Sequence, residues 1–287
     1  MTNRYGATVA KRRLSRRLAE LRIRNGYTAN QVCDKLSWGR GKVGRFEANA
    51  WRRPEMSDVR DLLRLYGVTD GERQELEGLA VLARVRSWWR EYGDVFGDNE
   101  YPGYEADAAR IRVFMPLILP GLLQTPAYIE AHMRVGTQPP AWRKRMLEAR
   151  LRRQEILNGA AAPELIAAPE LIAVITEASL KYRWGTRAAR RAQIAHLVDV
   201  SRRPGVELRL LRFADGPHPG MSSLISIFDF PGDEPSLVYV ENDAVTQEVS
   251  NTNEVASYSM IFDRIRDAAV NAPATTAHLE QLAATLE

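Results

Sequence analysis

The first third of the chain carries apolar residues at a helical period. Val9, Leu14, Leu18 and Leu21 recur every three to five residues among arginines, and Asn25-Gly26 then supplies a stop signal. Four further stretches repeat this pattern, and one of them contains several glycines. The pattern predicts helices over residues 9–24, 29–36, 40–47, 57–66 and 70–89, with Thr28 and Ser57 as N-caps.

The predicted third helix lies in Ser37–Glu47, SWGRGKVGRFE. If Gly39 is its N-cap, a step of 100° per residue puts Val43 and Phe46 on one side, and Gly41, Gly44 and Arg45 on the other. Two interior glycines cost roughly 2 kcal/mol in helix propensity. We therefore expect a helix that frays easily, and we expect serine at 41 and 44 to stiffen it.

Beyond Trp89 the pattern becomes mixed. Helical periods near 104–113, 126–135, 140–158, 187–202 and 252–271 are interleaved with stretches rich in β-branched and aromatic residues at 171–176, 206–213, 223–230 and 237–240. The last two of these read as a hairpin joined by Pro231–Pro235. The predicted fold is an all-α N-terminal bundle joined to a mixed α/β (α+β) C-terminal domain. We place the domains at 1–88 and 89–275, followed by a helical tail at 276–287.

A six-residue segment is duplicated in tandem. Residues 162–167 and 168–173 both read APELIA, a period far too short for a solenoid. We expect the second copy to lie in a strand and the first to lengthen the loop before it.

Charge divides the chain more sharply than its net value of +4 suggests. Residues 1–90 hold 20 basic and 10 acidic side chains, and residues 1–53 hold 14 and 3, a net charge of +11. A basic block of this kind typically binds a polyanion, because each neutralised phosphate releases counterions. The alternative is a basic face that is only solvated.

The second and third predicted helices have the layout of a helix-turn-helix, whose second member enters the major groove of double-stranded DNA. The close crossing of two such helices requires a small residue at the fifth position of the unit, and Cys33 stands there. Core-facing positions hold Val32, Leu36, Val43 and Phe46. We interpret this single cysteine as a small residue that packs where the helices cross, rather than as a reactive thiol.

Several motifs resemble known regulators. The segments RRLAELRIRNGYT, VCDKL, KVGRFE and RRPEMSDVRDLLRLYGV are similar to the helix-turn-helix of the lambda repressor and Cro (XRE-like) family. Later segments such as RSWWREY, VELRLLRFADGPHPGM and FDFPGDEPSLVYVEN resemble actinobacterial, antitoxin-like regulators that add a C-terminal domain of unassigned function. The resemblance implies a transcriptional regulator that acts beside a small partner protein.

The resemblance also implies roles for individual residues. It assigns base-edge contacts to Arg40, Gly41 and Arg45, phosphate contacts to Lys42, Arg52, Arg53 and Thr28, and an ion pair to Arg22 and Glu47. This sequence departs from the family pattern at five positions, where it has Ala29, Ser37, Gly39, Gly41 and Gly44. The family usually has serine at 39, 41 and 44, glutamine at 29 and glycine at 37, so the identity of the operator is open.

No pattern points to catalysis. The four histidines, His132, His196, His218 and His278, are scattered without metal-ligand spacing, and no glycine-rich phosphate loop follows a predicted strand. We expect no enzyme activity, no cofactor and no metal. There is no long apolar run and no signal peptide, so we also expect a cytoplasmic protein with no membrane partner.

Two interpretations stay open for the C-terminal domain. In the first, it forms a homodimer and receives a small partner protein, which would align two helix-turn-helix units with a palindromic operator. In the second, it holds a small-molecule pocket whose occupancy gates DNA binding. The aromatic residues that would line such a pocket are Trp88, Trp89, Tyr92, Phe114 and Tyr128, although aromatic clustering is also typical of a plain core.

Overall fold

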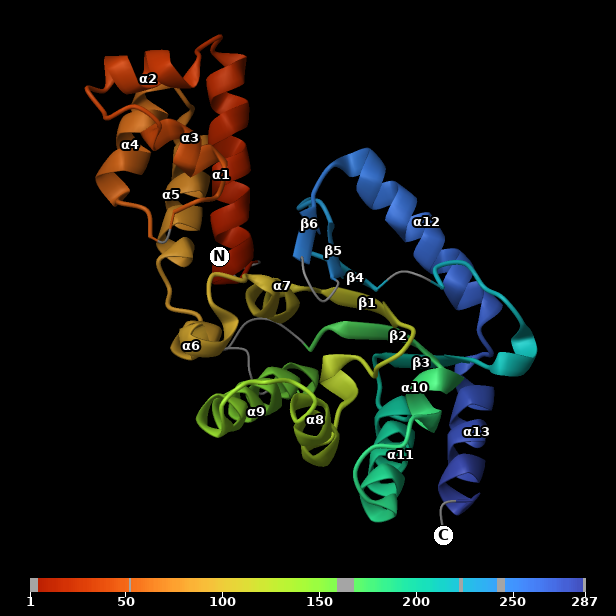
Figure 1. Ribbon diagram of the computed structural model, residues 1–287. Helices are drawn as coiled ribbons and strands as arrows, with labels where there is room; N and C mark the ends of the chain where they lie inside the picture. The colour runs from red at the N-terminus through yellow and green to blue at the C-terminus, as the bar shows by residue number, and fades with distance from the viewer. Residues whose placement is uncertain (1–4, 52, 159–167, 222–223, 242–245, 286–287) are drawn as a thin grey trace. The chain divides into compact units, whose positions relative to one another are not determined.

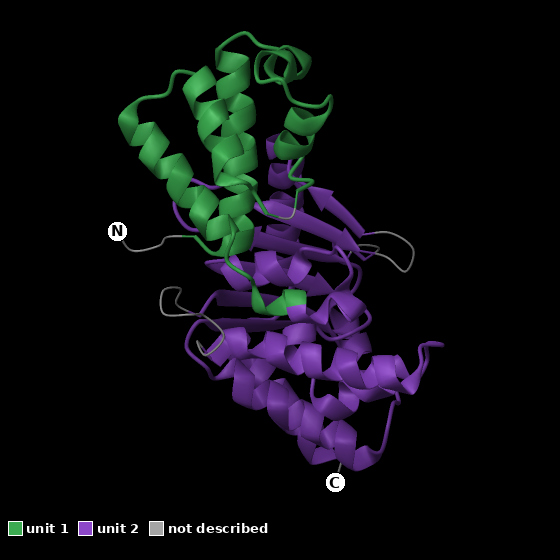
Figure 2. Cartoon of the chain, turned by 90° about the vertical axis from the view of Figure 1, so that its left-hand side faces the viewer, with its two compact units in different colours: residues 1–90 green, residues 91–287 purple. Residues whose placement is uncertain are grey.

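The computed structural model describes residues 5–51, 53–158, 168–221, 224–241 and 246–285. The chain divides into two compact units, Met1–Arg90 and Glu91–Glu287, which Figure 2 shows in different colours. Unit 1 is all helical, and unit 2 combines helices with one mixed sheet (Figure 1). This architecture confirms the predicted fold class.

Unit 1 consists of five helices and the first turn of a sixth, short one. Their bounds are α1 Ala7–Arg24, α2 Ala29–Lys35, α3 Lys42–Glu47, α4 Met56–Leu65 and α5 Asp70–Ala83, followed by the 3₁₀ helix η1 Trp88–Tyr92. Thr28 and Thr69 begin α2 and α5 through capping boxes with Gln31 and Glu72. Two predicted boundaries were wrong: Glu55 rather than Ser57 is the N-cap of α4, and α5 ends at Ala83 rather than near Trp89.

The core of unit 1 collects the apolar stripe of each helix. Leu14, Leu18 and Leu21 of α1 pack with the inner faces of the other helices, and each is almost fully buried. Cys33 lies in this core and is a free thiol. Side chains from α2, α3 and α4 complete it, including Val32, Val43, Phe46, Val59, Leu62 and Leu63.

Beyond Tyr92, the described residues of unit 2 form eight α-helices, three 3₁₀ helices and six strands. In chain order they are α6 Gly93–Phe96, α7 Tyr101–Asp107, β1 Arg110–Met115, η2 Gly121–Leu123, α8 Pro126–Met133, α9 Pro140–Gln154, η3 Glu155–Asn158, β2 Glu170–Thr176, α10 Glu177–Lys181, α11 Arg187–Ser201, β3 Val206–Leu211, η4 Phe213–Asp215, β4 Ile225–Asp229, β5 Leu237–Glu241, β6 Thr246–Val249, α12 Thr252–Ala268 and α13 Ala272–Thr285. With the 3₁₀ turns set aside, the helices are α6 to α13.

The sheet runs in the order β3-β2-β1-β4-β5-β6. Strands β1, β2 and β3 are parallel, with Val113 opposite Ala173 and Ala173 opposite Leu208. Strands β4, β5 and β6 add antiparallel neighbours on the other side of β1. The predicted hairpin is the β4–β5 pair, in which Ser226 lies opposite Tyr239.

Two elements differ from the sequence prediction. The helix predicted near 104–113 is wrong in its second half, because α7 ends at Asp107 and residues 110–115 form the central strand β1. Arg112 can occupy a central strand because Asp229 on the neighbouring β4 accepts two hydrogen bonds from it, at 2.9 and 2.8 Å, and Ser259 Oγ accepts a third at 3.3 Å. Strand β6 was not predicted, since it is a short edge strand with a mostly exposed, polar sequence.

Helices cover both faces of the sheet. On one face α12 packs Phe262 and Ile265 against Phe114, Ile225 and Val238, and Figure 1 shows α12 separated from the other helices. On the opposite face α7 contributes Tyr101, whose ring lies edge-on to Phe228 and Tyr239, with centroids 5.1 and 5.2 Å away. The sheet core therefore has aromatic side chains on both sides.

Two further predictions concern the duplicated segment and the tail. The second copy of the duplication leads into β2, which begins at Glu170, whereas the first copy lies outside the described residues. The tail forms α13, which begins at Ala272, packs along α11 and buries Leu279 completely, so the boundary predicted at 275 falls inside one helix. No described helix is long and apolar enough to cross a membrane.

Candidate nucleic-acid interface

Helix α3 begins later than the sequence predicted. Its first residue is Lys42 and its N-cap is Gly41, which has φ +81°, so Gly39 is not the cap. A positive φ of this size strains any residue with a Cβ, and glycine is suited to it. Serine at 41 would therefore strain the backbone rather than stiffen the helix, whereas Gly44 lies inside α3 and has open space around it.

The turn between α2 and α3 contains a second left-handed residue. Ser37 has φ +55°, the conformation for which the family's usual glycine is suited. Its backbone N–H donates to the carbonyl of Asp34 at 3.2 Å, and the N–H of Trp38 donates to the carbonyl of Cys33 at 2.8 Å. These bonds close the end of α2 and set the direction in which the chain enters α3.

Two tryptophans anchor α3 to its unit. The Phe46 ring stacks on Trp38 with centroids 6.3 Å apart and lies 5.6 Å from the Trp51 ring on its other side. The Trp51 Nε1–H donates to Ser15 Oγ on α1 at 2.9 Å and to the Phe46 carbonyl at 3.1 Å. Sequence reasoning assigned no role to either tryptophan, although their spacing around Phe46 was a usable signal.

Arg22 and Glu47 join α1 to the end of α3. Arg22 Nε and Nη2 donate to the two carboxylate oxygens of Glu47 at 2.6 and 2.9 Å, and Nη1 donates to the Tyr27 carbonyl at 2.7 Å. The hydrogen bond with Glu47 raises the pKa of Arg22 above its ordinary value. Because both side chains are mostly buried, this bidentate pair fixes the position of α3.

Lys42 has partners within unit 1. Its Nζ lies 2.7 Å from Asp58 Oδ1 on α4 and 4.1 Å from the centroid of the Trp38 ring. The charge predicted to contact phosphate is thus balanced by a carboxylate in the structure. This pair ties the first residue of α3 to α4.

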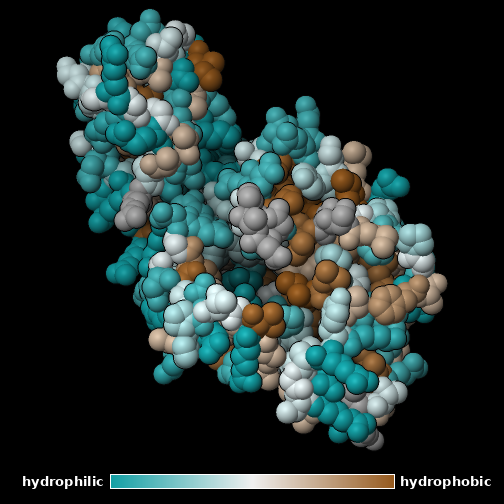
Figure 3. Space-filling model, viewed as in Figure 1, coloured by the Kyte–Doolittle hydropathy of each residue, from teal (hydrophilic) through white to brown (hydrophobic). Residues whose placement is uncertain are grey.

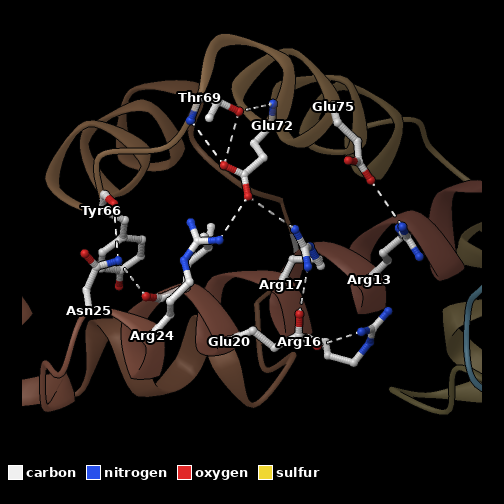
Figure 4. Close-up of polar contacts among 11 residues, drawn as sticks. Arg13, Arg16, Arg17, Glu20, Arg24, Asn25, Tyr66, Thr69, Glu72 and Glu75 are labelled. Atoms are coloured by element: carbon white, nitrogen blue, oxygen red, sulfur yellow. Dashed lines mark hydrogen bonds and ion pairs between the residues drawn. The ribbon is translucent and has the colours of Figure 1, made fainter.

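Most arginines of α1 are also paired, as Figure 4 shows. Glu72 of α5 accepts from Arg24 at 3.2 Å and lies 3.8 Å from Arg17, while Glu20 accepts from Arg16 and Arg17. Hydrogen bonds from Thr69 and Arg24 hold the pKa of Glu72 below its usual value. Arg13 pairs in the same way with Glu75 of α5 at 3.2 Å. Part of the excess positive charge of residues 1–53 is therefore neutralised by three acids that lie later in the sequence, Asp58, Glu72 and Glu75.

Arg40, Arg45 and Arg53 differ from most arginines of α1 in their exposure and in their lack of ion-pair partners within the part of the chain that the structure describes. All three side chains are exposed, and the described residues provide no ion pair for any of them. Arg40 lies just before α3, Arg45 lies on its exposed face with a guanidinium nitrogen close to Gly41, and Arg53 follows the helix. Thr28 is exposed, but its hydroxyl accepts from the Gln31 N–H, and Arg52 lies outside the described residues.

The five aromatic residues predicted to line a pocket have different surroundings among the described residues. Trp89 and Tyr92 are buried, Phe114 faces α12, and Tyr128 packs against Trp184 with ring centroids 4.8 Å apart. Tyr128 also borders a small cavity of about 10 Å³. Among the described residues no group of His, Cys, Asp and Glu side chains could hold a metal ion.

Comparisons with known families agree with this division of the chain. Residues 13–76 match the model of a helix-turn-helix domain, and residues 99–281 match that of a domain of unknown function, DUF5753. Neither the curated proteins nor the solved structures contain a match to the chain. The first match spans α1 to α5 and the second spans nearly all of unit 2.

Proposed function

The chain belongs to the DUF5753 family and carries a helix-turn-helix domain, and we propose that it is a sequence-specific, DNA-binding transcriptional regulator. The observation that carries the proposal is the contrast within unit 1, where most cations are paired and those around α3 are not. Exposed, unpaired arginines on and beside the second helix of such a motif stand where base edges and phosphates are contacted.

Each arginine has a distinct proposed role. Arg45, on the exposed face of α3, and Arg40, just before the helix, reach base edges in the major groove, where a bidentate arginine–guanine contact gives about 1–3 kcal/mol of discrimination. Gly41 beside them has no side chain, so the backbone there can approach the duplex closely. Arg53 and Arg52 contact phosphates. Lys42 keeps α3 in position through its ion pair with Asp58. To make its predicted phosphate contact, Lys42 must either bind Asp58 and the phosphate together or release Asp58.

The test is selection of sequences from a randomised duplex library by the full-length protein. The wild type should enrich one motif, and Arg45→Ala should lose preference at one position of it while retaining affinity for phosphate. Arg64→Ala is the matched control, because Arg64 is exposed but pairs with Asp61 on α4. Enrichment of no motif by the wild type would refute sequence-specific binding.

We also propose that the protein acts as a homodimer, because a helix-turn-helix reads a palindromic operator through two half-sites about one helical turn apart. Light scattering after size exclusion tests the proposal. A dimeric mass is expected, and a persistent monomer in the presence of the selected duplex would contradict it. Stable association with a small protein encoded nearby would instead support the partner interpretation.

A further inference from the structure

Unit 2 contains a cavity of about 460 Å³ that the interpretations above do not use. Its walls come from α6, α7, the end of β1, η2, α9 and the ends of β5 and β6. Figure 3 shows the surface of unit 2 hollowed on this side, with apolar surface along one flank and polar surface deeper inside. The volume falls in the range of sites that bind small molecules.

Two arginines of α9 line this cavity. Arg150 and Arg153 are three residues apart and so share one face of the helix. Burial and the neighbouring charge of Arg153 lower the pKa of Arg150 to about 10, which still leaves it protonated at neutral pH. The cavity therefore holds two positive charges at close range.

The positive charge of Arg153 is compensated by a carboxylate of the same unit. Its Nε lies 2.7 Å from Glu105 Oε2, and Glu105 is almost completely buried. Gly121 allows this arrangement, because a Cβ at that position would overlap the Arg153 guanidinium. The charge of Arg153 is thus used to balance Glu105 and is not available to a ligand.

Arg150 has no such partner. Its Nη1 donates to the amide oxygen of Gln124 at 3.2 Å, and no carboxylate among the described residues lies within ion-pair distance of it. Gln124 is in turn fixed by donating to the Leu119 carbonyl at 2.7 Å. Glu241 also borders the cavity and its charge favours the protonated form of Arg150, but it is exposed and makes no ion pair with it. At contact distance the Arg150 guanidinium therefore has a neutral partner and, among the described residues, no carboxylate.

The rest of the lining is mixed: Asn99, Tyr101, Glu241 and Thr246 are polar, and a group of large side chains is apolar. Val95 and Phe96 of α6, Met115 at the end of β1, Ile118, Met146 of α9 and Leu224 surround the space. A molecule that fills the cavity must therefore combine one anionic group with an apolar body. A planar guanidinium fork matches a carboxylate, and one unbalanced charge matches a monoanion better than a phosphate dianion, because the second negative charge of a phosphate would be desolvated without a partner.

We infer that this cavity binds a small amphipathic carboxylate, with the carboxylate on Arg150 and the apolar body against Phe96, Met115 and Met146. The inference does not depend on DNA binding, since every residue it uses belongs to unit 2. The apolar lining of the cavity includes Phe96 and Met115, which lie close in sequence to Tyr92 and Phe114, two of the aromatic residues that the sequence suggested.

The experiment is calorimetric titration and thermal shift of the full-length protein with phenylbutanoate, with its neutral amide and with phenyl phosphate. The carboxylate should bind and raise the melting temperature, and the amide should bind about tenfold or more weakly, because a charged hydrogen-bond partner is lost. Arg150→Gln should remove the preference for the acid. Lys144→Gln makes the same charge change on an exposed face of α9 and should leave binding unchanged.

A second variant tests the inference independently in case Arg150→Gln does not fold. Ile118→Trp fills the cavity from its apolar side and should abolish binding of the carboxylate while circular dichroism stays native. Equal binding of acid and amide, or undiminished binding by Arg150→Gln, would overturn the inference. So would tighter binding of phenyl phosphate, or the absence of binding at millimolar concentration for butanoate, phenylbutanoate and decanoate alike.

Discussion

The two units use arginine in opposite ways. In unit 1, Arg40, Arg45 and Arg53 are exposed around α3 without ion pairs among the described residues. In unit 2, Arg150 and Arg153 line a cavity, and one of them is held against a buried glutamate. An exposed guanidinium remains solvated and is free to exchange its counterions for phosphates, whereas a buried one must be balanced by the protein or by a ligand. The surroundings of an arginine, more than its place in the sequence, indicate its function.

The largest expected effect concerns the buried pair. Glu105→Leu should lower the free energy of unfolding by about 3–5 kcal/mol, because it leaves the Arg153 guanidinium buried and unbalanced. Glu170→Leu is the matched control, since its pair with Arg110 is about half exposed on both sides and should contribute at most about 1 kcal/mol. Chemical denaturation measures both. Equal losses for the two variants would remove the distinction between buried and exposed pairs.

The same glutamate predicts a pH dependence. Burial raises the pKa of Glu105 to about 7, although Arg153 opposes the shift. The native state therefore holds this proton more tightly than the unfolded chain, so its contribution to stability is complete at low pH and is lost as the pH rises through about 7. Glu105→Gln lacks the titration, so thermal melts at several pH values should show the stability of the wild type relative to the variant falling between about pH 4.5 and pH 7 and staying level above that. A difference independent of pH would contradict the shift.

In unit 1, Arg45→Ala should leave stability within about 0.5 kcal/mol of the wild type, because surface substitutions away from packed features change little. It should cost about 1–3 kcal/mol of discrimination between operator and mismatched DNA. Competition binding against single-base variants measures the second quantity and denaturation measures the first. A large loss of stability would show that Arg45 has a structural partner.

The two glycines of the recognition segment allow a paired test of how α3 is built. Gly41→Ala should destabilise unit 1 by about 1–2 kcal/mol, because residue 41 has a left-handed backbone. Gly44→Ala should stabilise it by up to about 1 kcal/mol, because residue 44 is helical and has open space around it. If both substitutions change the melting temperature in the same direction, α3 does not begin at Lys42.

The sequence predicted the helices of unit 1 well, because their apolar stripes and the Thr28 cap are local signals. It misplaced the start of α3, since a glycine at a cap and a glycine inside a helix look alike until the φ angle is known. It also overstated the free positive charge. The acids that neutralise α1, Glu72 and Glu75, lie some fifty residues or more further along, and charge counting over a window cannot see them.

In unit 2 the sequence predicted less of the structure, again because interacting residues lie far apart along the chain. Strand β1 was taken as helix because the partner of Arg112, Asp229, is more than a hundred residues away. Nothing in the sequence around Arg150 distinguishes it from the other arginines of α9, and only the fold shows that it faces a cavity.

The most direct test of the central claim compares two triple variants of equal charge. Arg40, Arg45 and Arg53 are changed to glutamine in one, and Arg16, Arg17 and Arg24, which are paired with Glu20 and Glu72, in the other. DNA affinity is measured against salt concentration for both. The account predicts that the first variant loses specific binding and that its salt slope falls by about 3, near 0.9 per charge, while the second loses less than about 1. Equal losses in the two variants would show that only net charge matters, and would contradict it.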